Sequence, residues 1–419
     1  EAVIVPLNPD YFISSTQNGG RQRSLTGGLT ISGVGISGST ASWVAPMFRD
    51  PNDHFTVYSF GTSVYKTTTL GNTWTTLGSP STFAGSTISV AAIAENNSSL
   101  IAISNSDKIE LSTNGGVSFV TIKNNLPTRS ISDIAFDPKN DSTIIVTYND
   151  YQNTGQKIYI SKNRGATWTN ITYNLGNMPI HTVVIDHSNN SNIYLGAEVG
   201  VYTKTMSATT WSLYNSNLPN VTVRDLEINN GSNTLKAATW GRGLWEYSLI
   251  NRNNHPAIIK TSISSPLTFF SPAVNTDQFV TSEISYSNTL TSVFVKWSLN
   301  NLDFNNTIIM NSIGNNKWET VSALNIDSVG AKVFFKVYAV GSSGDTTETY
   351  KFMYSLKPNE YCNASGESIN GNLYINNFSC ASVSNNGTGN TASTFYPNKI
   401  ISLNRNSTYN ISASFNTGW

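Results

Sequence analysis

The stretch Ser161-Lys-Asn-Arg-Gly-Ala-Thr-Trp-Thr-Asn170 decides the fold, because copies of it recur along the first half of the chain. "SLTGGLTI" starts at residue 24, "TTTLGNTW" at 67, "STNGGVSF" at 112, and a degenerate copy, "KTMSATTW", at 204. With the copy at 161, successive starts lie 43, 45, 49 and 43 residues apart. A period of this length with several strands per unit is typical of β-propeller blades.

The rest of each unit supports this interpretation. A turn such as "DPND" (50–53) or "DPKND" (137–141) comes before an apolar run, and a further strand leads into the motif. A sixth unit, at 223–249, has the turn and two strands but no motif after them. The sequence therefore predicts an all-β protein with a propeller over residues 1–250, whose closing blade needs an outer strand from elsewhere in the chain.

The motif suits a tight hairpin. Its first hydroxyl and its third side chain can bond backbone groups of the turn, its glycine can adopt positive φ, and its tryptophan can pack between blades. We expect these residues to hold the fold and to do no chemistry. The structural set is Ser24, Gly28, Thr67, Gly71, Trp74, Ser112, Asn114, Gly116, Ser161, Asn163, Gly165, Trp168 and Trp211.

The motif resembles the Asp-box, S-x-D-x-G-x-T-W, of sialidase-type and sortilin-type (BNR-repeat) propellers. The spacing and the ending "TWGRGLWEYS" (239–248) resemble the Asp-box propellers of secreted Bacteroidetes proteins, several of which are similar to xyloglucan-type glycosidases. The resemblance covers residues 1–250 and departs from the family at the acidic position, which is Thr26, Thr69, Asn114, Asn163 and Met206 in the five copies. It implies a secreted or cell-surface protein, with the type IX secretion machinery as a partner.

The second half of the chain contains two segments whose sequence patterns differ from that of the propeller. Residues 256–357 alternate strongly, as in "VFFKVYAV" (333–340), which predicts an immunoglobulin-like or fibronectin-III-like β-sandwich. Residues 358–419 resemble an incomplete GEVED domain of the same secreted proteins. Cys362 and Cys380 could form a disulfide or remain two unlinked small hydrophobic residues.

Composition limits the partners. The chain of 419 residues has 25 Lys and Arg against 25 Asp and Glu, and only 12% of its residues are charged, so nothing favours nucleic acid. No apolar stretch is long enough to span a membrane. The chain begins abruptly at "EAVIVPL", and we expect a leader, with further sequence, upstream of it.

Catalytic motifs are scarce. The histidines (His54, His181, His187 and His255) are scattered, so neither a metal nor a cofactor is expected. None of the arginines of the propeller region has the Arg-Ile-Pro context that starts sialidase domains. A glycosidase needs two carboxylates across a cleft, and Asp133 and Asp225 both occupy the innermost-strand position. They are the catalytic candidates, although each could instead cap a strand or pair with an arginine.

The aromatic residues suggest binding instead, because indole faces stack on sugars. The ligand-binding candidates are Trp240, Trp245 and Arg242. Trp43 and Tyr247 are further aromatic residues near predicted strand ends in the first and last blades. Two hypotheses stay open. The chain is a non-enzymatic recognition platform for a glycan or a surface protein. Alternatively, it is a xyloglucanase-like or sialidase-like glycoside hydrolase, or the non-catalytic part of a larger secreted hydrolase.

Overall fold

A computed structural model describes residues 1–152, 155–187, 192–215, 217–265, 277–299, 303–324 and 330–356, together with three strands near the C-terminus. The described chain is all-β apart from two short 3-10 turns, η1 (Gln17–Gly19) and η2 (Tyr173–Leu175). It divides into two compact units, Glu1–Lys357 and Pro358–Trp419.

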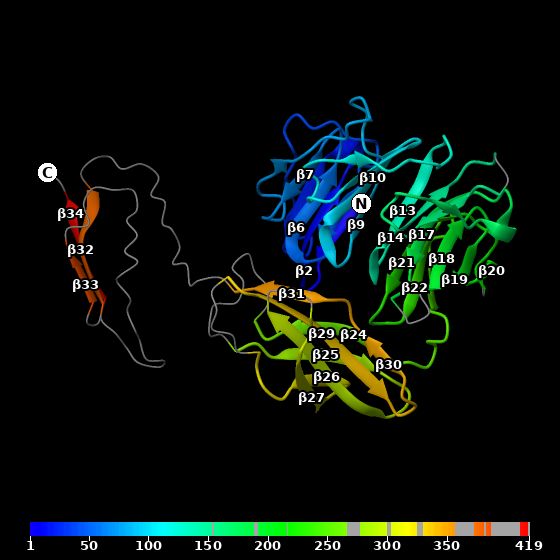
Figure 1. The fold of residues 1–419 in the computed structure, drawn as a ribbon. Coiled ribbons are helices and arrows are strands. Elements are labelled where there is room, and N and C mark those ends of the chain that lie inside the picture. The colour runs from blue at the N-terminus through cyan, green and yellow to red at the C-terminus, as the bar shows by residue number, and fades with distance from the viewer. Residues whose placement is uncertain are drawn as a thin grey trace. The chain divides into compact units, whose positions relative to one another are not determined.

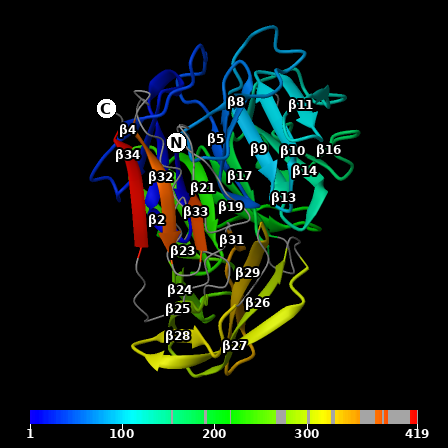
Figure 2. The ribbon, with the colours of Figure 1, turned by 90° about the vertical axis from the view of Figure 1, so that its left-hand side faces the viewer.

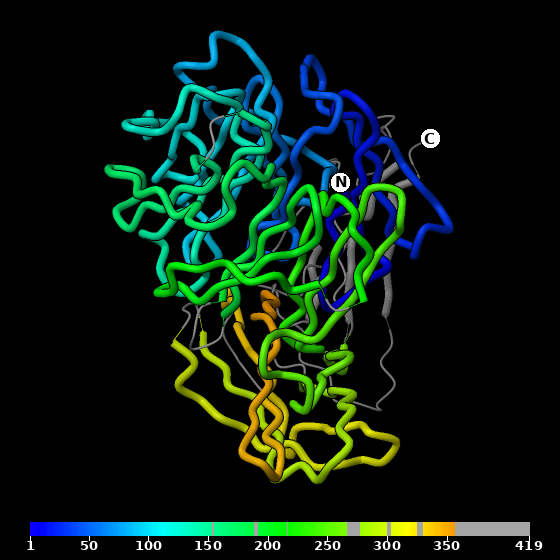
Figure 3. The backbone as a smooth tube through the Cα atoms, turned by 90° about the vertical axis from the view of Figure 1, so that its right-hand side faces the viewer, coloured from blue at the N-terminus to red at the C-terminus, as the bar shows by residue number. Residues whose placement is uncertain are grey.

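The first part of the larger unit is a six-bladed β-propeller, seen from opposite sides in Figures 2 and 3. We number its blades one to six in chain order. The innermost strands are β1 (Ala2–Val5), β5 (Met47–Asp50), β9 (Val90–Ala94), β13 (Ile131–Asp137), β17 (Ile180–Ile185) and β21 (Val223–Asn229). The second strands are β2 (Asn8–Ser15), β6 (Asp53–Phe60), β10 (Asn97–Asn105), β14 (Asn140–Tyr148), β18 (Asn192–Ala197) and β22 (Thr234–Thr239).

The outer half of each blade is shorter and differs in blade six. The third strands are β3 (Arg21–Leu25), β7 (Val64–Thr67), β11 (Lys108–Ser112), β15 (Ile158–Ser161), β19 (Val201–Thr205) and β23 (Leu244–Ser248). The fourth strands are β4 (Ser32–Gly33), β8 (Thr75–Thr76), β12 (Val120–Thr121), β16 (Thr169–Asn170) and β20 (Ser212–Leu213). Blades one to five have four strands, and blade six has three among the described residues.

The apolar runs are strands buried on both faces. In β14, Ile144 and Val146 belong to the cluster shared with blade three, while Ile145 belongs to the cluster shared with blade five. Because successive side chains of a strand point to opposite faces, a strand with a blade on each side is buried on both faces and shows no alternation of apolar and polar residues. The run "TIIV" thus follows from the stacking of blades.

The repeated motif forms the turn between the third and fourth strands. In the copy at 161, the Ser161 Oγ accepts the Gly165 N–H at 2.8 Å, and the Asn163 Oδ1 accepts the Thr167 N–H at 2.9 Å. In the copy at 67, the Thr69 Oγ1 takes over the second role and accepts the Thr73 N–H at 3.0 Å. One acceptor oxygen suffices, so Thr or Asn stands where the resemblance leads one to expect Asp.

The motif tryptophans fasten each blade to the one before it. The Trp168 Nε1 donates to the Ile122 carbonyl at 2.8 Å, and the Trp211 Nε1 donates to the Ile171 carbonyl at 2.9 Å. The backbone of Trp168 also exchanges two hydrogen bonds with the Asn125 amide, at 3.0 and 3.3 Å. Both indoles are buried, which agrees with the predicted packing between blades.

Blades one to six are joined in sequence by buried apolar clusters, but none of the clusters in the described chain joins blade six to blade one. In Figure 3 these two blades are neighbours in the ring. The predicted closing blade is therefore present, and none of the described strands supplies its fourth strand.

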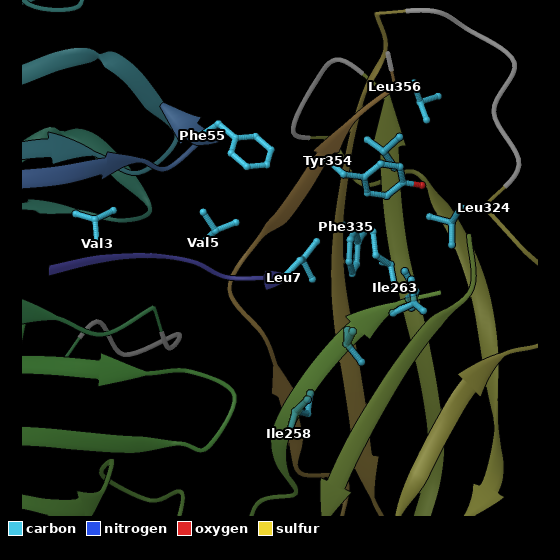
Figure 4. Close-up of a cluster of buried hydrophobic side chains, with 14 of the residues drawn as sticks. Val3, Val5, Leu7, Phe55, Ile258, Ile263, Leu324, Phe335, Tyr354 and Leu356 are labelled. Carbon is cyan, nitrogen blue, oxygen red and sulfur yellow. The ribbon is translucent and has the colours of Figure 1, made fainter. Parts of the chain in front are cut away.

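The remainder of the larger unit is one curled antiparallel sheet (Figure 1). Its strands, in spatial order, are β24 (Ala257–Ile263), β25 (Val280–Ser285), β28 (Lys317–Thr320), β27 (Asn306–Gly314), β26 (Leu290–Leu299), β29 (Lys332–Gly341) and β30 (Thr346–Glu348), with β31 (Phe352–Ser355) also on β29. The sheet curls around a core that includes Phe335 and Tyr354, and the propeller residues Val5 and Leu7 extend that core (Figure 4). The two halves of the predicted sandwich are thus continuous through the β26–β27 pair.

The smaller unit contains a three-stranded sheet in the order β33 (Val383–Asn386), β32 (Leu373–Cys380), β34 (Ile411–Thr417). Cys362 lies outside the described residues, so the disulfide with Cys380 stays a prediction. The resemblance to a GEVED domain likewise stays a prediction.

Candidate binding site at the axial mouth

The inner strands of blades four, five and six begin at the same end of the propeller, which we call the axial mouth. The Ser132 Oγ at the start of β13 donates to the Ile180 carbonyl at the start of β17, at 2.7 Å. In all three blades the pairing with the second strand skips one residue here: Ser132, His181 or Arg224. Such a bulge re-aims the skipped side chain, so these residues are placed by the backbone at the mouth.

Five side chains form a connected group at the mouth, which we call the mouth cluster: Tyr151, His181, Glu198, Arg224 and Trp240. The His181 Nε2 lies 2.9 Å from the Glu198 Oε2, and the Arg224 Nη1 lies 3.3 Å from the His181 Nδ1. Because a guanidinium can only donate, Nδ1 must accept, and the ring proton must sit on Nε2 and be donated to Glu198. The cluster thus has a defined direction of hydrogen bonding.

Glu198 is the acceptor at the centre of the cluster. Its hydrogen bond with His181 is the largest cause that lowers its pKa, and the hydroxyls of Tyr151 and Thr222 add to the effect. The Tyr151 side chain comes from the loop between β14 and β15 and is 62% exposed. Glu198 is therefore held ionised, with an exposed aromatic ring beside it.

Trp240 is the most open part of the cluster. It lies in the loop between β22 and β23, its side chain is 70% exposed, and the Arg224 guanidinium lies 5.2 Å from its ring centroid. Its backbone N–H donates to the Thr222 carbonyl at 2.8 Å, which fixes the loop. Of the other predicted binding residues, Arg242 is exposed in the same loop, and its carbonyl accepts the Trp245 Nε1–H at 3.0 Å.

Asp133 joins two blades. Its two oxygens accept the N–H groups of Ile134 in its own strand and Val183 in the next blade, each at 2.8 Å. Burial raises the pKa of Asp133 to about 7, although these hydrogen bonds favour the charged form. A carboxyl group held by backbone on both oxygens is positioned to bridge blades, and it has little freedom to meet a substrate.

Asp225 occupies the equivalent place in blade six. One oxygen accepts the Leu226 N–H at 2.9 Å, as Asp133 does with Ile134. Burial raises the pKa values of Asp225, Asp133, Glu1 and Glu227, and the charge of Asp225 adds to the rise at the other three groups. The two predicted catalytic carboxylates therefore lie within electrostatic range of each other.

The opposite end of the propeller axis is closed by the curled sheet. The Tyr350 hydroxyl donates to the Ile228 carbonyl of blade six at 2.8 Å, and the Tyr350 ring makes an edge contact with His187 of blade five. Lys351 donates to the Asn52 Oδ1 at 2.6 Å and to the Glu95 carbonyl at 3.2 Å, which adds blades two and three. The segment between β30 and β31 thus joins four blades.

A polar cleft of about 720 Å³ lies beside this closure, lined by residues that include Lys139, Asn230 and Arg252. Two of its ionisable side chains are already paired within the fold: Arg252 lies 3.2 Å from Asp186, and His187 lies 2.8 Å from Glu95. The mouth cluster, with its exposed aromatic rings, is therefore the better candidate for ligand binding.

No group of three or more His, Cys, Asp or Glu side chains in the described ranges could hold a metal ion. Three of the histidines face carboxylates instead: His181 with Glu198, His187 with Glu95, and His255 with Asp345. Nor does any helix of the described chain have the length and apolar character needed to cross a bilayer.

Sequence reasoning singled out Trp240 and Arg242 but not the network beside them. His181, Glu198 and Arg224 lie in different strands and loops, and no motif connects them. A signal existed: the three residues skipped by the bulges occupy equivalent positions when the blades are aligned on their inner strands.

No family model matches the chain, and no curated protein matches it. Among solved structures, a GH74 xyloglucanase from Xanthomonas campestris is 11% identical over 89% of this chain and 74% of its own, with a TM-score of 0.49. An ancestral GH74 enzyme is 13% identical over 83% of this chain, with a TM-score of 0.44, and this chain spans only 61% of its length.

YCF48, in a structure bound to a D1 peptide, is 13% identical over 67% of this chain and 87% of its own, with a TM-score of 0.42. At these identities and TM-scores the likenesses carry no argument about what this chain does. The strand pairing defines the class: the chain is a six-bladed β-propeller protein in which the propeller is closed at one end by a curled β-sheet.

Proposed function

We propose that the propeller is a recognition platform and that its ligand site is the mouth cluster. The observation that carries this proposal is the joining of the two exposed rings of Trp240 and Tyr151 to an oriented set of polar groups. Flat aromatic faces beside hydrogen-bond donors and acceptors suit a glycan, whose ring faces are apolar and whose hydroxyls are polar.

The ordering of the cluster favours binding. Arg224, His181 and Glu198 hold one another in place before any ligand arrives, so little side-chain entropy is lost on binding. Trp240 is fixed through its backbone while its ring stays open to solvent.

Binding to a glycan array, followed by titration of the best ligand, tests the proposal. We expect Trp240→Ala to weaken binding at least tenfold, because it removes the main stacking surface. Ile309→Ala, which trims another exposed apolar side chain (61% exposed) on the curled sheet, is the matched control and should leave affinity unchanged. Equal binding by both variants would contradict the assignment of the mouth.

The second candidate function is glycoside hydrolysis, and one observation favours it. Asp133 and Asp225 are close enough to influence each other, and burial raises the pKa values of both, as an acid catalyst requires. Hydrolysis assays on the array hits test it. Turnover that is lost in Asp133→Asn and in Asp225→Asn, with binding retained, would make the protein an enzyme and overturn the purely binding role.

The cellular setting belongs to the same proposal. We propose a secreted or cell-surface protein exported by the type IX secretion system, in which the Asp-box-like propeller binds and the following domains connect. The support is the motif and the "TWGRGLWEYS" ending, together with the resemblance of residues 358–419 to a GEVED domain. Fractionation of the producing cells, with and without a functional type IX system, tests this.

A further inference from the structure

A buried lysine of the curled sheet lies against a side-chain amide of the propeller. Lys351 follows β30, is only 5% exposed, and donates through its Nζ to the Asn52 Oδ1 at 2.6 Å. Because a carbonyl bond is about 1.2 Å long, the Lys351 Nζ lies within about 3.8 Å of the amide carbon Cγ. That separation is close to the 3–3.5 Å, roughly, at which two reacting atoms must be held.

Both partners are fixed by further hydrogen bonds. The Asn52 N–H donates to the Asp50 Oδ1 at 2.8 Å, and the Asn52 Nδ2 donates to the Ser98 Oγ at 2.7 Å. The Lys351 Nζ also donates to the Glu95 carbonyl at 3.2 Å. The fold therefore supplies in advance the orientation that an amine and an amide lack in solution.

The surroundings of the amine favour its neutral form. Burial lowers the pKa of Lys351 to about 8. Among the nearby charges, Lys336 and Arg49 lower the pKa further, whereas Glu95 and Asp50 raise it. About a tenth of the amine is neutral at pH 7 as a result, against about one part in a few thousand for an exposed lysine. Only the neutral amine has the lone pair that attacks a carbonyl carbon.

The other side of the amide carries the groups that a leaving nitrogen needs. The Ser98 hydroxyl, which accepts from the Asn52 Nδ2, itself donates to the Asp50 carboxylate. A hydroxyl beside a carboxylate can pass a proton to the nitrogen as its bond to carbon breaks. The Arg49 Nη1 is buried without a hydrogen-bond partner among the described residues, and its charge reaches Lys351. Arg49 thus adds positive charge near the carbonyl oxygen that becomes negative during attack.

From this arrangement we propose that Lys351 and Asn52 form an intramolecular isopeptide bond, which fastens the curled sheet to blade two at the closed end of the propeller. The Nζ lone pair attacks Cγ and forms the new amide bond, and the Cγ–Nδ2 bond breaks with its electron pair left on Nδ2. One proton released from Nζ passes through the Asp50 carboxylate and the Ser98 hydroxyl to Nδ2, which leaves as ammonia. An amine and an amide become a new amide and ammonia, so no oxidant, reductant or cofactor is needed.

The bond is independent of the mouth cluster and alters the charge of the closed end. An amide nitrogen does not titrate near neutral pH, so the pH dependence that the Lys351 amine gives to unfolding belongs to the chain before the bond forms.

Mass spectrometry of the full chain, incubated in the folded state and then denatured, tests the proposal. We expect the intact mass to be lower than that of the sequence by one ammonia molecule. Trypsin should release residues 50–66 linked to a peptide in which Lys351 is uncut. The rate of bond formation should rise about tenfold between about pH 7 and pH 9, because the neutral fraction of the amine rises by that factor.

Lys351→Arg is the matched control, since it keeps a positive charge and a donor for Asn52 but has no nucleophilic amine. It should keep the full mass, as should Asn52→Ala. The linked peptide is read on the unsubstituted chain, so the result does not depend on how the variants fold. An unsubstituted chain that keeps its full mass after several days at about pH 9, with Lys351 cut by trypsin, would overturn the proposal. So would an equal loss of ammonia in Lys351→Arg, because the ammonia would then come from another asparagine, such as Asn230 before Gly231.

Discussion

Two glycines occupy the same position in different copies of the repeated motif. Replacing each by alanine measures how tightly the neighbouring blade packs against that position. Gly165 and Gly28 have φ values of 84° and 91°. A Cβ on Gly165 would lie 2.6 Å from the Cβ of Ile122 in blade three, whereas a Cβ on Gly28 would meet nothing closer than the Phe12 Cζ at 3.9 Å. Substitution by alanine therefore imposes the same backbone penalty at both sites and a steric clash at only one.

The magnitudes follow from these distances. A left-handed conformation costs an L-residue about 1–2 kcal/mol, so Gly28→Ala should destabilise blade one by about that amount. Gly165→Ala adds the cost of forcing Ile122 away from its buried position, about 1–3 kcal/mol for overpacking. We expect a total loss of about 2–5 kcal/mol, concentrated at the interface of blades three and four.

Native-state hydrogen exchange read by mass spectrometry is the assay, because it gives the free energy of opening for each blade in the full chain. Peptides covering β14 and β15 should lose protection in Gly165→Ala, and those covering β2 and β3 should lose less in Gly28→Ala. Equal losses in the two variants would refute the reasoning, since the clash with Ile122 would then contribute nothing.

Three further predictions use the same logic. Asn174→Ala removes two hydrogen bonds to the Trp211 backbone and should cost about 2 kcal/mol, whereas Asn217→Ala, at an exposed asparagine that also precedes a leucine, should change unfolding by less than about 0.5 kcal/mol; urea denaturation compares them. Burial lowers the pKa of the unlinked Lys351 amine to about 8, so the unfolded chain holds the extra proton between pH 8 and about 10.4. Stability should therefore rise by about 3 kcal/mol across that window, and a pH series of thermal unfolding should show no such rise in Lys351→Met. Burial also lowers the pKa of His54 well below 6.5, so stability should fall as the pH drops below about 6.5, and His54→Gln should flatten that part of the same series.

The hairpin motif was predictable from sequence because its bonds are local. Ser161 and Gly165 are four residues apart, and a hydroxyl can accept a nearby backbone N–H without contacts from the rest of the fold. The incomplete sixth unit was predictable for the same reason, since a missing motif means a missing hairpin. The source of the outer strand was not, because pairing at an open edge depends on which segment reaches it.

The roles of the candidate site residues, in contrast, could not be predicted from the sequence. Asp133 and Asp225 were chosen because they share a strand position, and the structure gives Asp133 a role in joining blades through the Val183 N–H. That bond crosses 50 residues of sequence, and neither composition nor spacing reveals it. Sequence alone cannot distinguish a carboxylate held by two backbone groups from one that faces a ligand.

The sequence by itself determined the repeat, the strand periodicity and therefore the blades, because these depend on contacts within one unit. Only the tertiary structure decided which side chains meet at the axis. Tyr151, His181, Glu198, Arg224 and Trp240 come from three successive blades, and they become neighbours only when those blades stack around one axis. Among the described residues no strand covers the outer edge of β23, which agrees with the missing copy of the motif after the third strand of the sixth unit.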